Sequence, residues 1–232
     1  MTTRFNALSK AMAKRLFDIV ASLSMLILCS PVYLLAAVLV KLGSPGPVHH
    51  QAIRAGKNNK PFKLFKFRTM VVNADQVGPG ITASHDPRIT SVGKILRKTK
   101  LDEIPQLWNV LTGDMSIIGP RPEDPKYVRF YTEEQLRVLS VRPGLSGPAA
   151  IRYRHEEKIL AQNSGNLEEY YLRTILPDKL NLDLNYIDSR SIWGDLVLCM
   201  KTAKTIFEKD DELLDFQGSV GSTIQSEKHT IE

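Results

Sequence analysis

The hydrophobic pattern of the first forty residues differs from that of the rest of the chain. An uncharged apolar run, IVASLSMLILCSPVYLLAAVLV, extends from Ile19 to Val40 and is flanked by Lys14, Arg15 and Lys41. At about 1.5 Å of rise per helical residue, this run is long enough to cross a hydrocarbon layer of about 30 Å. It exceeds the apolar part of a cleavable signal peptide, and no small-residue cleavage pattern follows it. The sequence therefore predicts a membrane segment that stays in the mature protein.

Ser30 and Pro31 interrupt the apolar run near its centre. Proline lacks an N–H group, its ring clashes with the carbonyl four residues earlier, and it disfavours helical backbone at the preceding residue. One interpretation is a kinked helix that crosses the membrane. The other is a re-entrant hairpin that turns at Ser30 and Pro31 and returns to the same side. Basic residues flank both ends of the run, which favours both ends on the cytoplasmic side.

After Lys41 the pattern becomes that of a globular domain. GSPGP, from Gly43 to Pro47, is a turn-rich linker, and the β-like stretches VHHQAI and PFKLFKFRTM follow it. Residues 71–87 are expected to form a mobile loop, and the polar tail from Lys209 is expected to be disordered. Apolar spacings of three and four predict helices over residues 88–98, 102–111, 132–140, 154–162, 166–186 and 191–208.

Composition and charge narrow the classes of partner. The chain has 232 residues, of which 43% are hydrophobic and 24% charged, so it can build a folded core. Its formal net charge of +6 indicates an anionic partner, which could be nucleic acid, a lipid headgroup surface or a phosphorylated substrate. Nucleic acid is the weakest of these, because aromatic residues make up 7% and no recognition motif is present. Cys29 and Cys199 are far apart and support neither a disulfide framework nor a thiolate metal cluster.

The stretch TKLDEIPQLWNV, from Thr99 to Val110, places Asp102 and Glu103 between a basic run and an apolar helical pattern. In the simplest interpretation Asp102 caps the helix and Glu103 complements the helix dipole. The alternative is chemical, because adjacent helical side chains point about 100° apart, so one carboxylate can attack or bind a metal while the other supports it. Basic residues around an acid pair, with few Cys or His, suit a hard cation and a phosphate better than zinc.

Arginines in two proline-containing stretches supply donors for a phosphate. Arg121 lies between Pro120 and Pro122, which restrict its backbone, and Arg142 belongs to VRPGLSGPAAIRYR. Each stretch taken alone is also compatible with ordinary turns and surface arginines. The sequence contains no G-x-S-x-G elbow, Walker A loop or G-x-G-x-x-G motif.

Together these motifs resemble one protein family. KRLFDIVAS, CSPVYLLAAVLVKLGSPGPV, KLFKFRTM, GKILRKTKLDEIPQLWNVLTGDMSIIGPRP and VRPGLSGPA look like successive signatures of the bacterial sugar transferases, the monotopic phosphoglycosyl transferases. The resemblance runs from about Lys14 to Phe207 and leaves out the N-terminal domain of longer members, so the chain resembles the minimal catalytic form. GPAAIRYR departs from the Gly-Trp or Gly-Gln-Ala version of many relatives, which puts sugar recognition in doubt more than reaction type.

The resemblance implies transfer of a phosphosugar from a UDP-sugar to undecaprenyl phosphate, with release of UMP, as the first membrane step in assembly of exopolysaccharide, capsule, O-antigen or glycoprotein glycan. It implies that Asp102 is the nucleophile of a covalent aspartyl-phosphosugar intermediate and that Glu103 assists. Because a carboxylate attacking a diphosphate meets like-charge repulsion, Mg²⁺, or alternatively Mn²⁺, and arginines are expected to neutralise the charge. The candidate metal ligands are Asp102 and Glu103. The candidate phosphate- and substrate-binding residues are Lys66, Arg68, Arg97, Arg121 and Arg142.

The implied fold is an α-rich α+β fold, with a re-entrant membrane hairpin broken at Ser30 and Pro31 and a small interfacial catalytic domain with short β segments. The expected divisions are a lead-in over 1–13, the hairpin over 14–42, the catalytic domain over 43–208 and a tail over 209–232. The resemblance places the domain on the cytoplasmic face of the bacterial inner membrane. The expected partners are the UDP-sugar, undecaprenyl phosphate and membrane lipids, without nucleic acid, and a homo-oligomer is left open. The alternative function is a non-catalytic membrane-anchored scaffold of a glycan assembly complex, which predicts no covalent intermediate.

Overall fold

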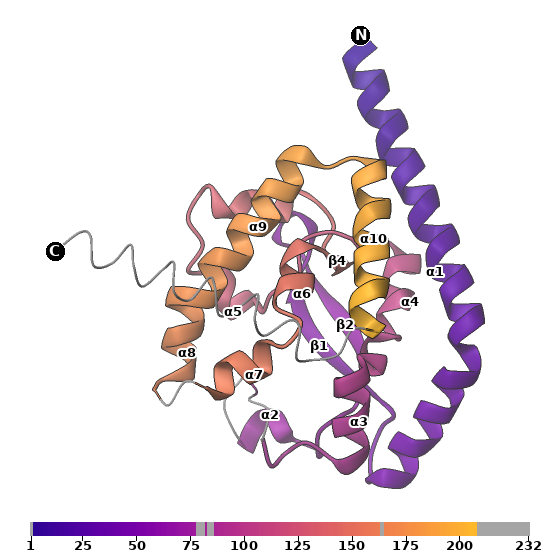
Figure 1. Cartoon of the computed structure of the whole chain (residues 1–232), viewed down its shortest axis with the longest axis vertical. Helices are drawn as coiled ribbons and strands as arrows, with labels where there is room; N and C mark the ends of the chain where they lie inside the picture. The colour runs from indigo at the N-terminus through magenta and orange to yellow at the C-terminus, as the bar shows by residue number, and fades with distance from the viewer. Residues whose placement is uncertain (1, 78–81, 83–85, 163–164, 208–232) are drawn as a thin grey trace, which may run out of the picture.

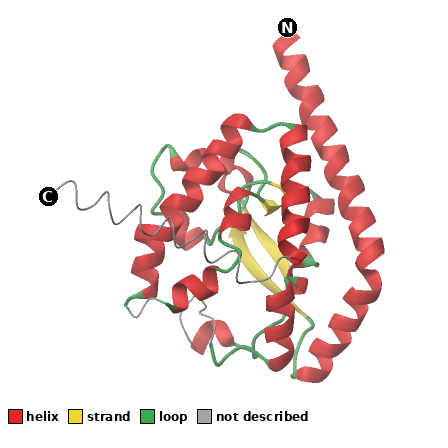
Figure 2. Cartoon of the chain, viewed as in Figure 1, coloured by secondary structure: helices red, strands yellow, loops and turns green. Residues whose placement is uncertain are grey.

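The structure is a computed structural model that describes residues 2–77, 82, 86–162 and 165–207. Helices predominate and the strands are few and short, as the α-rich α+β prediction requires (Figure 1, Figure 2). The tail expected from Lys209 and the Gly78 to Gly80 part of the expected loop lie outside the described residues.

α1 (Thr2–Gly43) is one long helix that runs along one side of the molecule (Figure 1). The hairpin predicted at Ser30 and Pro31 is not confirmed, because Pro31 lies inside this helix. The helix continues for a local reason. Pro31 cannot donate to the carbonyl of Ile27 four residues earlier, but the Ser30 hydroxyl donates to that carbonyl at 2.8 Å. A neighbouring hydroxyl thus satisfies the group that proline leaves free.

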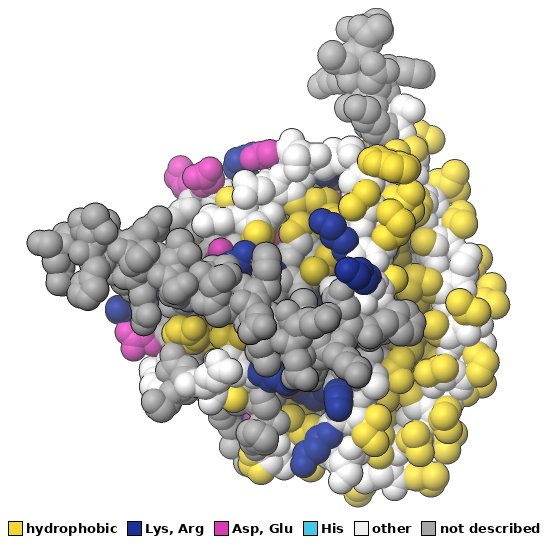
Figure 3. Space-filling model, viewed as in Figure 1, with side chains coloured by type: hydrophobic (Ala, Val, Ile, Leu, Met, Phe, Trp, Pro, Cys, Tyr) yellow, Lys and Arg dark blue, Asp and Glu magenta, His cyan; other side chains and the backbone are white. Residues whose placement is uncertain are grey.

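Both halves of α1 pack against the rest of the protein through one narrow face. Before Pro31, Asp18 is buried and accepts hydrogen bonds from other elements. After it, Ala36 and Val40 are buried in a cluster with Phe67. The opposite side of the helix exposes large apolar side chains, which form a broad hydrophobic surface over α1 (Figure 3). The exposed residues include Met12, Leu16, Val20, Leu23, Ile27, Leu28, Leu34, Leu35, Val38 and Leu42.

The two β-like stretches of the sequence form one antiparallel hairpin. β1 (His49–Ala55) pairs with β2 (Pro61–Phe67), with His49 opposite Phe67. A second pair is parallel and joins β3 (Ser116–Ile118) to β4 (Gly144–Ser146). The hydrophobic pattern did not predict β3 and β4, because three residues are too few for an alternation to be recognised.

The helices agree with the sequence pattern best where they are long. The predicted segments 88–98, 102–111 and 191–208 are helical over most of their length, whereas 132–140 contains only a short 3₁₀ helix. The helical elements after α1 are η1 (Lys57–Asn59), α2 (Ala74–Val77), α3 (Ser91–Thr99), η2 (Leu101–Glu103), α4 (Gln106–Thr112), α5 (Pro125–Val128), η3 (Gln135–Ser140), α6 (Pro148–Arg152), α7 (Glu156–Ala161), α8 (Leu167–Tyr170), the π-helical η4 (Tyr171–Ile175), α9 (Leu176–Ser189) and α10 (Ile192–Phe207).

A buried ion pair lies within the aromatic core beside α9. Lys179 Nζ is 3.0 Å from Glu156 Oε2, 3.1 Å from the Tyr171 hydroxyl and 4.0 Å from Glu123 Oε2. The Tyr171 hydroxyl also donates to Glu123. We call these four residues the Lys179 network. Each charged side chain of the network has a partner in it. Since these residues come from α7, α9 and the loop before α5, the network joins these segments across the core.

Candidate active site

A left-handed residue positions the acid pair between two helices. α3 begins at the Thr90 cap, whose hydroxyl accepts from Gly93 N at 2.9 Å, and ends at Lys100, which has φ 58°. Lys100 turns the chain directly into η2, where Asp102 and Glu103 are second and third. Neither side chain caps η2 or α4, so the simple capping interpretation of Asp102 does not hold.

Asp102 is a buried carboxylate with an unused oxygen. It is 7% exposed, and its Oδ1 atom makes no hydrogen bond within the described part of the chain. Burial raises the pKa of Asp102 above its usual value, although the positive charge of Lys66 opposes this. A buried charged oxygen without a donor is costly, and such groups concentrate at functional sites.

Glu103 is instead surrounded by cations. Its Oε1 atom accepts from Lys66 Nζ at 3.0 Å and from Arg121 Nη2 at 2.8 Å. Burial alone would raise the pKa of Glu103, but Arg121, Lys66 and Lys100 outweigh it and hold this pKa well below the usual range. Glu103 is therefore an anion that keeps several cations in place beside Asp102.

We name Asp102, Glu103, Lys66, Lys100 and Arg121 the acid-pair cluster. It brings Lys66 from β2 and Arg121 from the loop after β3 to Glu103, as a shared phosphate site requires. Lys100 was not among the predicted site residues. Burial lowers its pKa, and it lies close enough to Glu103 for the two charges to interact. Its place two residues before Asp102 was the one signal in the sequence.

Arg97 lies at the edge of this cluster. Its positive charge lowers the pKa of Asp102, but its guanidinium forms an ion pair with Glu157 of α7 and donates to the Thr69 hydroxyl at 3.3 Å. The guanidinium of Arg97 therefore binds the carboxylate of Glu157, whereas the sequence predicted that it would bind a phosphate.

Two of the predicted arginines are used elsewhere. Arg68 is buried, and its guanidinium donates to backbone carbonyls at the end of α1, including Ser44 O at 2.8 Å. Arg142 Nε donates to Gly113 O at 2.7 Å, which places Arg142 at the C-terminal end of α4, whereas the acid pair precedes that helix. Arg68 thus holds the linker after α1, and Arg142 does not join the acid-pair cluster.

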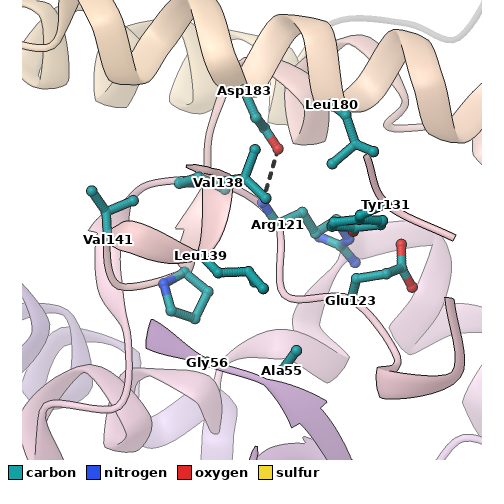
Figure 4. Close-up of a pocket in the computed structure, with 12 residues that line it drawn as sticks. Ala55, Gly56, Arg121, Glu123, Tyr131, Val138, Leu139, Val141, Leu180 and Asp183 are labelled. Atoms are coloured by element: carbon teal, nitrogen blue, oxygen red, sulfur yellow. Dashed lines mark hydrogen bonds between the residues drawn. The ribbon is translucent and has the colours of Figure 1, made fainter. Parts of the chain in front are cut away.

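Asp183 of α9 holds the backbone of the Arg121 loop, a contact that sequence reasoning missed. Arg121 N donates to Asp183 Oδ2 at 3.3 Å (Figure 4). Burial raises the pKa of Asp183 to about 7, although the backbone N–H groups of Arg121 and Ala149 oppose this. The cavity that these residues line has a volume of about 20 Å³, which suits one water molecule and not a nucleotide.

The oxygen atoms of the acid pair fit a hard cation better than a soft one. Within the described residues there is no group of three or more His, Cys, Asp or Glu side chains able to hold a metal ion. Two adjacent carboxylates, with an unused Asp102 oxygen, match the way Mg²⁺ is usually bound, through one or two carboxylates together with water and substrate phosphates.

Comparisons with known proteins identify the family of the chain. A family model described as bacterial sugar transferase matches residues 9–209. Over 199 residues the chain is 39% identical to a UDP-N-acetylgalactosamine-undecaprenyl-phosphate N-acetylgalactosaminephosphotransferase of Aeromonas hydrophila, covering 84% of this chain and 44% of that protein. It is 36% identical over 203 residues to a UDP-glucose:undecaprenyl-phosphate glucose-1-phosphate transferase of Caulobacter vibrioides, covering 85% and 71%. An Escherichia coli K12 protein of the same name is 40% identical over 195 residues, 82% of this chain and 39% of that protein.

Proposed function

The chain belongs to the bacterial sugar transferase family, and on that premise we propose that it transfers a sugar 1-phosphate unit from a UDP-sugar to undecaprenyl phosphate and releases UMP. The observation that carries this proposal is the acid pair. Asp102 offers a buried oxygen that has no hydrogen-bond partner among the described residues, while Lys66, Lys100 and Arg121 lie around Glu103 beside it. These are the charges that a carboxylate needs if it is to approach a diphosphate.

In the proposed first step, a carboxylate oxygen of Asp102 attacks the phosphorus that carries the sugar. The bond from that phosphorus to the bridging oxygen breaks, and UMP leaves with the electron pair. In the second step an oxygen of the lipid phosphate attacks the same phosphorus and releases Asp102. Arg121 and Lys66 balance the charge of the transferred group, and Glu103 holds both of them in position. Mg²⁺, held by Asp102 and Glu103, would supply further neutralisation of the diphosphate when bound.

We further propose that α1 enters the membrane from one side and carries the catalytic domain at the cytoplasmic surface of the inner membrane. Residues Ala11–Gly43 form an apolar helix long enough to span a bilayer. However, the same domain packs on α1 at Asp18 and again at Val40, which lie about 33 Å apart along a helix. A helix that crossed the membrane would carry these charged elements into hydrocarbon, at a large free-energy cost. If both ends of α1 instead stay on one side, with the exposed apolar face in lipid and the opposite face against the domain, that cost is avoided.

The test of the reaction is UMP release from a panel of UDP-sugars, with undecaprenyl phosphate as acceptor. We expect ping-pong kinetics and, without acceptor, an acid-pair adduct visible by intact-protein mass spectrometry. Exhaustive EDTA treatment should abolish turnover, and Mg²⁺ should restore it. No UMP release with any donor would instead favour the membrane-anchored scaffold, and kinetics requiring a ternary complex would refute the covalent route.

A further inference from the structure

A basic cavity, distinct from the small one beside Asp183, lies at the C-terminal end of α4. The acid pair lies before the other end of this helix. The volume of the cavity is about 510 Å³, and it lies between the N-terminal half of α1, β3 and the turn from α9 to α10. No member of the acid-pair cluster lines it, so it is separate from the candidate active site. The charged side chains that line it are Lys14, Arg15, Lys57, Arg142, Arg190, Asp18 and Asp195.

The two carboxylates of this cavity are already satisfied by the protein. Asp195 Oδ2 is 2.6 Å from Lys14 Nζ, and Asp195 Oδ1 accepts from the Tyr186 hydroxyl at 2.6 Å. Asp18 Oδ1 accepts from Ile117 N at 3.1 Å and from the Ser116 hydroxyl at 3.0 Å. Asp195 thus offsets the charge of Lys14, and because five cations and two acids line the cavity, its lining keeps a net positive charge.

Three of the cations keep donors that can face a ligand. Arg15 is occupied, since it donates to the carbonyls of Val110 and Leu111 and so caps α4. Arg142 donates from Nε to the Gly113 carbonyl, and neither of its terminal nitrogens forms a hydrogen bond or ion pair within the described residues. Lys57 and Arg190 are exposed, and within the described residues neither forms an ion pair with a carboxylate. Cations from three separate segments thus converge on one cavity.

Large apolar side chains lie next to the cavity and indicate the environment that surrounds it. Ile192 lines it and is 48% exposed, and the following Trp193 is 71% exposed. On α1, Ala11 lines the cavity, and Met12 is 66% exposed. Exposed tryptophan and aliphatic side chains beside lysine and arginine are typical of protein surfaces at the depth of lipid headgroups.

We infer that this cavity binds the phosphate group of an anionic phospholipid, at a site distinct from the one where the lipid substrate reacts. The inference rests on the proposed membrane position of α1 and is independent of the Asp102 chemistry. Lys57, Arg142 and Arg190 contact the headgroup phosphate, and the acyl chains lie along α1 and the start of α10. A headgroup held at this end of α4 fixes how α1 and the domain packed on it are rotated together about the axis of α1. This rotation sets the depth at which the acid pair meets its acceptor.

The test measures lipid binding to the full chain in detergent micelles, by native mass spectrometry with phosphatidylglycerol or phosphatidylcholine. The test variant is Lys57→Gln/Arg190→Gln, because both residues are exposed and neither belongs to the acid-pair cluster. Its matched control is Lys60→Gln/Lys63→Gln, which removes the same charge from exposed residues outside the cavity. At about 1 kcal/mol for each basic residue near an anionic surface, we expect about 30-fold weaker phosphatidylglycerol binding in the test variant. The control should bind as the parent does.

Three results would overturn the inference. If the parent bound the two lipids with equal affinity, the cavity would not be a site for an anionic headgroup. If both double variants lost the same affinity, the binding would depend on net charge and not on this cavity. Full competition by millimolar inorganic phosphate or glycerol phosphate would assign the cavity to a soluble anion. Asp102→Asn separates this inference from the proposed function, because that variant should bind phosphatidylglycerol normally while losing UMP release. If the parent releases UMP but shows no preference between the two lipids, the lipid-binding inference is refuted while the proposed function is not.

Discussion

The acid-pair cluster and the Lys179 network are both buried groups of mixed charge, but they use their carboxylates differently. In the Lys179 network, Glu156 is 3.0 Å from Lys179 Nζ, and Glu123 accepts from Tyr171. In the acid-pair cluster, Glu103 accepts from two cations while Asp102 keeps an oxygen without a partner. A satisfied buried pair holds elements together, whereas an unsatisfied buried carboxylate costs free energy and remains available for reaction. Four substitutions test this contrast.

The largest effect is expected from Asp102→Asn. Removal of the nucleophile should lower UMP release by about a thousandfold or more. The melting temperature should stay equal to that of the parent or rise, because the variant no longer buries a charged carboxylate whose Oδ1 atom lacks a hydrogen-bond donor within the described residues. Thermal unfolding and turnover are measured on the same preparation. Asp114→Asn, an exposed acid beyond the end of α4, is the control and should change neither quantity. A large fall in melting temperature for Asp102→Asn would show that Asp102 has a structural role, and it would contradict the difference between the acid-pair cluster and the Lys179 network.

Lys179→Met should have the opposite profile. It leaves the partly exposed carboxylates of Glu123 and Glu156 without their buried cation, at a cost of about 3 kcal/mol in the free energy of unfolding. Urea unfolding measures this cost. Lys126→Met, which breaks the exposed pair with Glu168, should cost less than about 1 kcal/mol. Adding Glu156→Gln to Lys179→Met should recover part of the loss, and no recovery would mean that the pair is not the source of stability.

Arg121→Lys should affect activity more than stability. A lysine keeps the charge, but it lacks the planar fork that can bind Glu103 and a phosphate together. We expect kcat to fall about a hundredfold, with a melting temperature close to that of the parent. Steady-state kinetics with a saturating donor separates kcat from KM. An unchanged kcat with a raised KM would restrict Arg121 to ground-state binding.

The smallest effect is expected from Asp183→Asn and appears in the pH dependence of stability. Burial raises the pKa of Asp183 to about 7, so the folded state holds a proton that the unfolded state releases at about pH 4. The stability that this group contributes is therefore fully present below about pH 4 and is lost as the pH rises through about 7. Between about pH 5 and pH 8 the parent should lose up to about 2 kcal/mol that the variant retains. Urea unfolding across this range tests the difference, with exposed Asp188→Asn as control. Parallel curves for parent and Asp183→Asn would contradict it.

The sequence predicted the long elements and the acid pair, but it could not place every arginine. Lys66 and Arg68 are two residues apart in KLFKFRTM and would share a face in a strand. β2 ends at Phe67, however, so Arg68 leaves the strand and points to the carbonyls after α1. A bend at Ser30 and Pro31 was expected from the missing N–H group, and the family resemblance favoured a hairpin there. The Ser30 hydroxyl compensates for the missing group. Both outcomes depend on where a particular side chain finds a partner, which residue spacing does not specify.

The packing of α1 also orders events during synthesis. α1 is synthesised before the other elements of the described structure, yet Lys14 pairs with Asp195, 181 residues later in the chain. Until α10 has been made, the charged start of α1 lacks this partner, while its apolar face already needs lipid. Contacts of such long sequence separation form late, because closing a long loop costs entropy. With α1 in the proposed membrane position, the membrane would therefore receive the helix as a nascent chain, and the domain would complete its folding on the membrane surface.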